Sequence, residues 1–162
     1  MDELERNDDM SIESYLKDMQ KQLMIKNEKI LKTEAKRLKN CIQNQIDNYY
    51  ESYTPVVGGY DRTNRFKTSL YVEDIINLNI ISNRIEIKLA FNPDLAWHDS
   101  LFSDEGAYVP LLINNGWSWD EIITPNDHFS NYKGFHYIER GIKDFNRTNP
   151  YGIHVEFVNE WE

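Results

Sequence analysis

The side chains able to do chemistry are few, and their spacing matches no common catalytic or metal-binding pattern. The chain contains four histidines (His98, His128, His136 and His154) and a single cysteine, Cys41. No histidine lies three to five residues from another histidine or from the cysteine, as typical zinc-binding pairs do. Cys41 lies on the apolar side of a predicted helix, which indicates a small core residue, and one cysteine excludes a disulfide framework.

An acidic loop is the best candidate for a metal ion, and it lacks the pattern of a known site. It contains Asp94, His98, Asp99, Asp104 and Glu105, without the regular oxygen-ligand spacing and fixed glycine of a calcium loop. Sugar hydrolysis uses a pair of carboxylates about 5–10 Å apart. With 27 acids in the chain some pair will always meet this distance, so the sequence gives no evidence for or against such a site. No Gly-x-Ser-x-Gly motif or phosphate-binding glycine loop is present. We expect no enzyme, no cofactor and no metal.

Length and composition predict one soluble globular domain. The chain has 162 residues, of which 40% are hydrophobic and 13% aromatic, enough for a packed core. No apolar run approaches the ~18–20 residues of a membrane span. Residues 1–10 are acidic and polar, unlike a signal peptide. We expect no membrane partner and a location in a reducing compartment.

The net charge of −9 is distributed unevenly. Residues 1–10 carry five acids and one base, residues 11–53 six acids and eight bases, and residues 54–162 sixteen acids and nine bases. The first segment predicts a flexible acidic tail, and residues 11–162 a single domain. The acidic total argues against sequence-specific nucleic-acid binding. The basic and acidic segments can attract each other within or between subunits.

A long helix is predicted over residues 11–53, which contain no proline or glycine. One apolar stripe is predicted to be buried, with most steps of three or four residues: Ile12, Leu16, Met19, Leu23, Ile30, Leu31, Ala35, Leu38, Ile42, Ile46, Tyr49 and Tyr53. About 40 residues span about 60 Å, whereas a compact domain of this size is only about 40 Å across. The helix therefore either breaks near Lys26 and Asn27, where the stripe weakens, or contacts a neighbouring subunit, which we favour.

The remaining pattern predicts an α+β fold with an antiparallel sheet of about four strands. Residues 76–80 and 85–89 alternate and predict a hairpin that pairs Ile80 with Ile85, Leu78 with Ile87 and Ile76 with Leu89. Strands are also predicted at 67–72 and at 152–158, the second with Ile153, Val155 and Phe157 on one face. A short helix is predicted at 109–115, stopped by Gly116, and a helix at 135–147, where Ile138, Ile142 and Phe145 are spaced four and three apart. Residues 92–134 are otherwise predicted to form aromatic-rich loops.

Aromatic residues gather in two regions, and two interpretations of them remain open. One group lies at the end of the long helix (Tyr49, Tyr50, Tyr53, Tyr60 and Phe66), and the other in the predicted loops (Trp97, Phe102, Tyr108, Trp117 and Trp119). They can form satellite core beneath long loops. They can also form a subunit interface, because Tyr and Trp supply large, stiff contact surfaces.

Three segments, in this order after a long helix, resemble a known family. They are Tyr49–Thr63, with the pattern Tyr-x-x-Tyr-x-Pro followed by Tyr-x-Arg-Thr, then Gly106–Trp117, and finally Gly134–Ile138. Together they are similar to the tail-component (morphogenesis) family of tailed bacteriophages, named after gene product ten of a lambdoid coliphage. The resemblance covers roughly residues 15–158, with departures at Asn64-Arg65-Phe66 and a longer loop at 92–106.

The resemblance implies a minor virion protein that joins head and tail. Such a protein forms a homo-oligomeric ring in the neck or completed tail, contacts phage connector and tail proteins, and assembles in the bacterial cytoplasm; packaged DNA would pass through the ring. The matching interaction residues are Tyr53, Pro55, Tyr60, Arg62, Thr63, Gly116, Trp117, His136 and Tyr137. The alternative function is an acidic protein-binding inhibitor or nucleic-acid mimic, although bases are interspersed among its acids.

Overall fold

The computed structural model describes residues 12–52, 64–73, 77–79, 84–98, 107–118 and 131–158. Its helical elements are α1 (Ile12–Ser52), the 3₁₀ turn η1 (Phe66–Thr68), α2 (Pro93–Ala96), α3 (Val109–Asn115) and α4 (Tyr137–Asn146). Its strands are β1 (Leu70–Val72), β2 (Asn77–Asn79), β3 (Arg84–Glu86), β4 (Leu89–Phe91), β5 (Trp97–His98), β6 (Ala107–Tyr108), β7 (Trp117–Ser118) and β8 (Asn131–Tyr132). The predicted α+β class, with a long first helix and a shorter last one, is confirmed.

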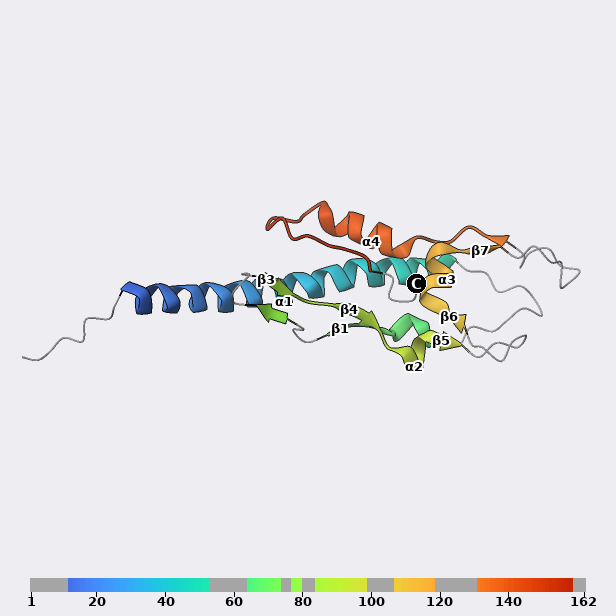
Figure 1. The fold of residues 1–162 in the computed structure, drawn as a ribbon. Coiled ribbons are helices and arrows are strands. Elements are labelled where there is room, and N and C mark those ends of the chain that lie inside the picture. Colours follow the sequence, from blue (N-terminus) through green and yellow to red (C-terminus); the bar gives the residue numbers. More distant parts are fainter. Residues whose placement is uncertain are drawn as a thin grey trace, which may run out of the picture.

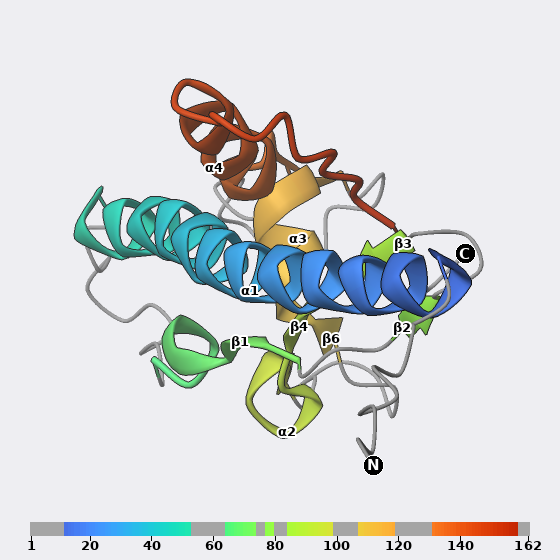
Figure 2. The same ribbon diagram turned by 90° about the vertical axis from the view of Figure 1, so that its left-hand side faces the viewer.

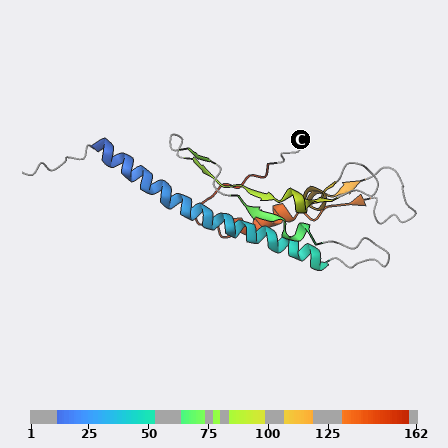
Figure 3. The same cartoon turned by 90° about the horizontal axis from the view of Figure 1, so that it is seen from below.

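Helix α1 is continuous over 41 residues, so the predicted alternative of a break near Asn27 is wrong. A weak apolar stripe does not interrupt backbone hydrogen bonds, and Lys26 and Asn27 both tolerate helical geometry. At 1.5 Å per residue the helix is about 61 Å long. Its N-terminal part extends well beyond the other elements (Figures 1 and 3). The length argument therefore predicted correctly that α1 exceeds the body of its own domain.

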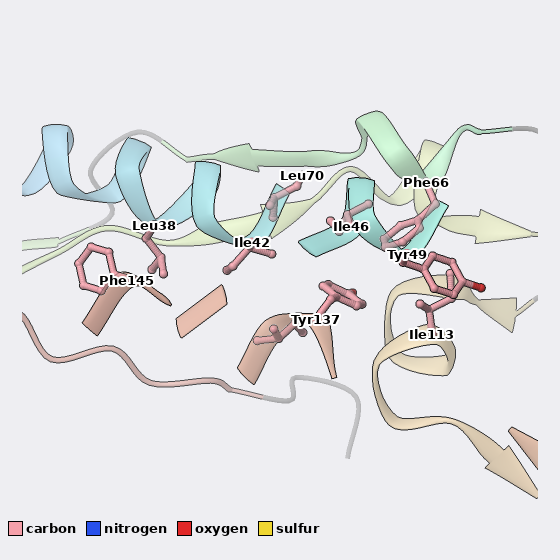
Figure 4. Close-up of a cluster of buried hydrophobic side chains, with 10 residues drawn as sticks. Leu38, Ile42, Ile46, Tyr49, Phe66, Leu70, Ile113, Tyr137 and Phe145 are labelled. Carbon is pink, nitrogen blue, oxygen red and sulfur yellow. The ribbon is translucent and has the colours of Figure 1, made fainter. Parts of the chain in front are cut away.

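The C-terminal part of α1 lies between α4 on one side and β1 with η1 on the other (Figure 2). Helix α4 was predicted to bury Ile138, Ile142 and Phe145, and these residues belong to or pack against the common core. The core also contains Leu38, Ile42, Ile46 and Tyr49 of α1, Phe66, Leu70, Ile113 and Tyr137 (Figure 4). The core is thus built on one half of α1.

Strands β1 to β4 form nested antiparallel pairs, β1 with β4 and β2 with β3. The predicted hairpin exists, but its register was wrong by two residues, because Leu78 pairs with Ile85 and Asn79 with Arg84. A two-residue slip keeps every side chain on its face of the strand, so hydrophobic alternation alone cannot choose between the two registers.

The prediction of one sheet of about four strands was wrong, since in the described residues every sheet has only two strands. Residues 67–72 divide between η1 and β1. Residues 152–158 form no strand; of the three side chains expected on one face, Ile153 and Val155 pack against the core, whereas Phe157 is exposed. The Asn149 side chain accepts a hydrogen bond from Ile153 N at 3.0 Å and donates one to Ile153 O at 2.9 Å. The backbone groups of Ile153 are therefore already paired and cannot bond to an adjacent strand.

Candidate interaction site

The structure brings together two of the three segments that carry the family resemblance. Helix α3 with Gly116 comes from the second segment, and the start of α4 with His136 and Tyr137 comes from the third. The two lie side by side at the C-terminal end of α1 (Figures 1 and 2). Trp117 lies in β7, paired with Tyr132. The other predicted interaction residues lie outside the described residues: Tyr53, Pro55, Tyr60, Arg62 and Thr63.

A close backbone crossing at Gly134 joins these two segments. A Cβ at Gly134 would lie 2.4 Å from Asn114 O and 2.8 Å from Gly116 N, and its φ is +81°. The next two amides complete the contact, because Phe135 N donates to Ile113 O at 2.8 Å and His136 N to Asn114 O at 3.0 Å. Only glycine fits both the approach and the left-handed backbone here. Gly134 is therefore the position that lets α4 begin against α3.

Asn114, which the sequence analysis missed, is the polar centre of this junction. Its side chain is fully buried, and its Oδ1 accepts from Ile138 N at 2.9 Å in the first turn of α4. Its Nδ2 donates to Glu139 Oε1 at 3.1 Å and to Asn115 Oδ1 at 2.9 Å. An amide from α3 thus caps the N-terminus of α4, a role usually taken by a residue of the helix itself. In the sequence, Asn114-Asn115-Gly116 indicated only the end of a helix.

His136 and Tyr137 are adjacent but face different surroundings. His136 is exposed and has a left-handed backbone with φ of 53°. Tyr137 is fully buried and donates its hydroxyl proton to Pro110 O at 2.9 Å. Burial raises the pKa of the Tyr137 hydroxyl well above its usual value. Tyr137 therefore fixes α4 to α3 inside this chain, and only His136 of the two faces solvent.

The seam between α1 and α4 depends on a glycine and an arginine that the sequence analysis also missed. A Cβ at Gly141 would lie 2.6 Å from the Ile42 side chain and 2.7 Å from its Cα, so the two helices touch at this point. One turn further on, the Arg37 guanidinium lies 3.9 Å above the Phe145 ring and donates to Phe145 O at 3.1 Å and Thr148 Oγ1 at 3.0 Å. Glu34, almost fully buried, pairs with Arg37 at 2.6 Å. This planar fork ties the end of α4 to α1.

The helix-end aromatics form core in the described part of the chain. Tyr49 contacts Tyr50 and Phe135, with ring centroids 5.6 and 5.3 Å apart. Phe66 contacts Tyr50 and Tyr137, at 6.3 and 5.7 Å. Trp97 of the second group contacts Tyr108 at 5.8 Å and is 41% exposed. Tyr49 and Phe66 thus belong to the main core and Tyr50 packs against it, while Tyr53 and Tyr60 lie outside the described residues.

None of this geometry assembles reactive groups. Among the described residues, no three His, Cys, Asp or Glu side chains converge on a common point where a cation would fit. Of the acidic loop considered above, Asp99, Asp104 and Glu105 lie outside the described residues. Cys41 is half-buried against the core, and burial raises the pKa of its thiol. What the described junction does is position α3 and α4 on α1.

Within the described residues, most of the exposed large apolar side chains lie on the N-terminal part of α1. Its large apolar side chains are exposed, in contrast to the predicted single buried stripe: Ile12, Tyr15, Leu16, Met19, Leu23 and Ile25. The change occurs between neighbouring residues, since Leu23 is 56% exposed and Met24 only 7%. Solvent-exposed apolar surface arranged along one element is typical of an interaction site. We define the α1 arm as residues 12–23.

No family model, curated protein or solved structure matches this chain. In the part of the chain that the structure describes, no helix combines the length and apolarity that crossing a membrane requires. The α1 arm presents exposed aliphatic side chains on a continuous helix whose other end is packed into the body.

Proposed function

We propose that this chain is a virion structural protein of a tailed phage or prophage, which joins head and tail as a neck or tail-completion component. It assembles as a homo-oligomeric ring and contacts the neighbouring connector and tail proteins. Its location is the virion, after assembly in the cytoplasm of the bacterial host. Packaged DNA passes through the ring without being read in sequence.

The observation that carries this proposal is the α1 arm. Helix α1 is about 61 Å long and extends beyond the body of the chain. Its exposed end carries Ile12, Leu16, Met19 and Leu23, apolar side chains that burial against a partner would remove from water. The family resemblance of the sequence supports the same function, because it implies a ring-forming protein that joins head and tail. Burying aliphatic surface between subunits is the usual source of affinity in permanent assemblies.

The proposal is tested by assembly of the purified full-length chain. We expect light scattering and negative-stain images to show a ring, or a smaller species that forms one when connector and tail proteins are added. A strict monomer that ignores those proteins and binds a basic enzyme tightly would contradict the proposal and favour the acidic inhibitor. Portal and capsid genes upstream and tail genes downstream are the expected gene neighbourhood.

A further inference from the structure

Helix α1 carries two apolar stripes on different faces, not one. The exposed stripe consists of Ile12, Leu16, Met19 and Leu23, with steps of four, three and four residues. At about 100° per residue these four side chains and the half-buried Ile30 lie on one face of the helix. The residues buried against the body, from Met24 to Tyr49, lie roughly 110° further around the helix. The exposed stripe therefore points away from the core of its own chain and needs another partner.

The exposed stripe has the residue spacing of a two-helix interface, and it ends where α4 begins to cover the same face of α1. Alternating steps of three and four residues are those of the core positions of a coiled coil, with Lys26 at the one polar position before Ile30. Beyond Ile30 the same face continues to Glu34 and Arg37, which the end of α4 covers. Among the described residues nothing covers this stripe from Ile12 to Leu23, and one turn beyond Ile30 the chain's own body covers the same face.

Charge along this part of the chain is divided into two opposite halves. Within residues 12–30, residues 12–20 contain two acids and one base, a net charge of −1. Residues 21–30 contain one acid and three bases, a net charge of +2. The boundary lies at the centre of the exposed stripe, between Met19 and Leu23. Two copies in parallel would place like charges side by side, whereas two antiparallel copies place each acidic half along a basic half.

We propose that the partner of the α1 arm is the same helix of a second copy of this chain, with residues 12–30 of the two copies packed antiparallel about a two-fold axis near residue 21. In this register Ile12 lies opposite the partner's Ile30, and Met19 opposite the partner's Leu23. The stem of Lys26 covers the partner's Leu16 and carries its ammonium group to solvent. The partner helix begins opposite Ile30, one turn before the surface that α4 covers at Glu34 and Arg37.

This proposal deepens the proposed function in one respect, since it rests on the α1 arm being a contact between subunits. The pairing is isologous, so it joins copies two by two; a ring closes only through separate, heterologous contacts between other surfaces of the chain. The neighbouring copy's acidic body is the competing occupant, because residues 54–162 carry a net charge of −7. The antiparallel arm is favoured because it matches both the apolar spacing and the charge boundary.

Distances between spin labels on the full-length chain test the geometry. In a Cys41→Ala background, labels are placed on Ser14→Cys or on Lys21→Cys, two positions opposite the seam. In the antiparallel pair the two Lys21→Cys labels lie level, whereas the two Ser14→Cys labels are displaced by about 21 Å along the axis. We therefore expect a clearly longer intersubunit distance for Ser14→Cys. Equal distances would mean a parallel pair, and no intersubunit distance at either position would mean another partner; each result overturns the proposal.

A matched pair of variants tests the surface. Leu16→Asp with Leu23→Asp places charges in the seam, and we expect self-association to weaken at least tenfold while the far-UV circular dichroism stays unchanged. Ser14→Asp adds the same type of charge on the outer face and is expected to change association less than twofold. Unchanged association of the double variant would contradict the pairing.

The pairing and the proposed function fail separately. If the spin labels show an antiparallel pair but the chain does not assemble with connector and tail proteins, only the head–tail function is refuted. If the chain assembles with those proteins but the labels show no antiparallel pair, only the pairing is refuted.

Discussion

The two parts of α1 differ in what covers them. The C-terminal part packs against α4, β1 and η1, and Ile46 is completely buried. The α1 arm has the same helical geometry and a comparable supply of aliphatic residues, yet Ile12 is 79% exposed. A segment of this chain can therefore be helical without being buried against the rest of the chain. A helix this long forms from local preferences together with anchoring at one end, and its free part remains available for another molecule.

The sharpest test of this contrast places a charge in the covered part. Leu38→Asp and Ile42→Asp each put a carboxylate into the core between α1 and α4, where both residues are less than 10% exposed. We expect a loss of more than about 4 kcal/mol in the free energy of unfolding, enough to prevent folding of a marginally stable domain. Urea unfolding followed by circular dichroism measures it. A stable, native-like Ile42→Asp protein would show that this half of α1 is not buried as described.

Gly141→Ala is the second largest expected effect. The added methyl group would overlap both the side chain and the backbone of Ile42, so α4 must move away from α1. Overpacking of this kind costs about 1–3 kcal/mol, more than the gain in helix propensity from alanine. Thermal and urea unfolding measure the change. As a control, Gly152→Ala meets no neighbouring atom, so only the strain of its positive φ contributes.

Asn114→Ala tests the cap that one helix provides for another. It removes the acceptor for Ile138 N and the donor to Glu139 at a fully buried position. We expect a loss of about 1–3 kcal/mol, since buried partners are left unsatisfied. Asn44→Ala, an exposed position on α1, is the matched control and is expected to change stability by less than about 0.5 kcal/mol. Equal effects of the two variants on urea unfolding would argue against the capping role.

Leu16→Asp is expected to have the smallest effect on folding, and it is informative because it is expected to weaken self-association at the same time. Leu16 is 56% exposed, so we expect the free energy of unfolding of the monomer to change by less than about 0.5 kcal/mol. Self-association is expected to weaken at the same time, as measured by light scattering across a concentration series. Together with Ile42→Asp, this variant separates the part of α1 that holds the fold from the part that holds a partner. An unfolded Leu16→Asp protein would contradict that division.

Local patterns determined much of the architecture from the sequence. The absence of proline and glycine predicted α1, Gly116 predicted the end of α3, and the Ile138, Ile142 and Phe145 spacing predicted α4. These signals act within a few residues of one another, which is why one sequence suffices to find them. The length of α1 compared with the size of a domain also predicted that the helix would exceed its body.

Tertiary structure alone decided which neighbours these elements meet. Helical periodicity placed Leu23 on the predicted buried stripe and left Met24 out, whereas the position of the body exposes Leu23 and buries Met24. The hairpin register moved by two residues because a strand with period two repeats its faces. Gly134, Asn114 and Arg37 each act on segments distant in the chain, through backbone approach and buried polar contacts that no local pattern records.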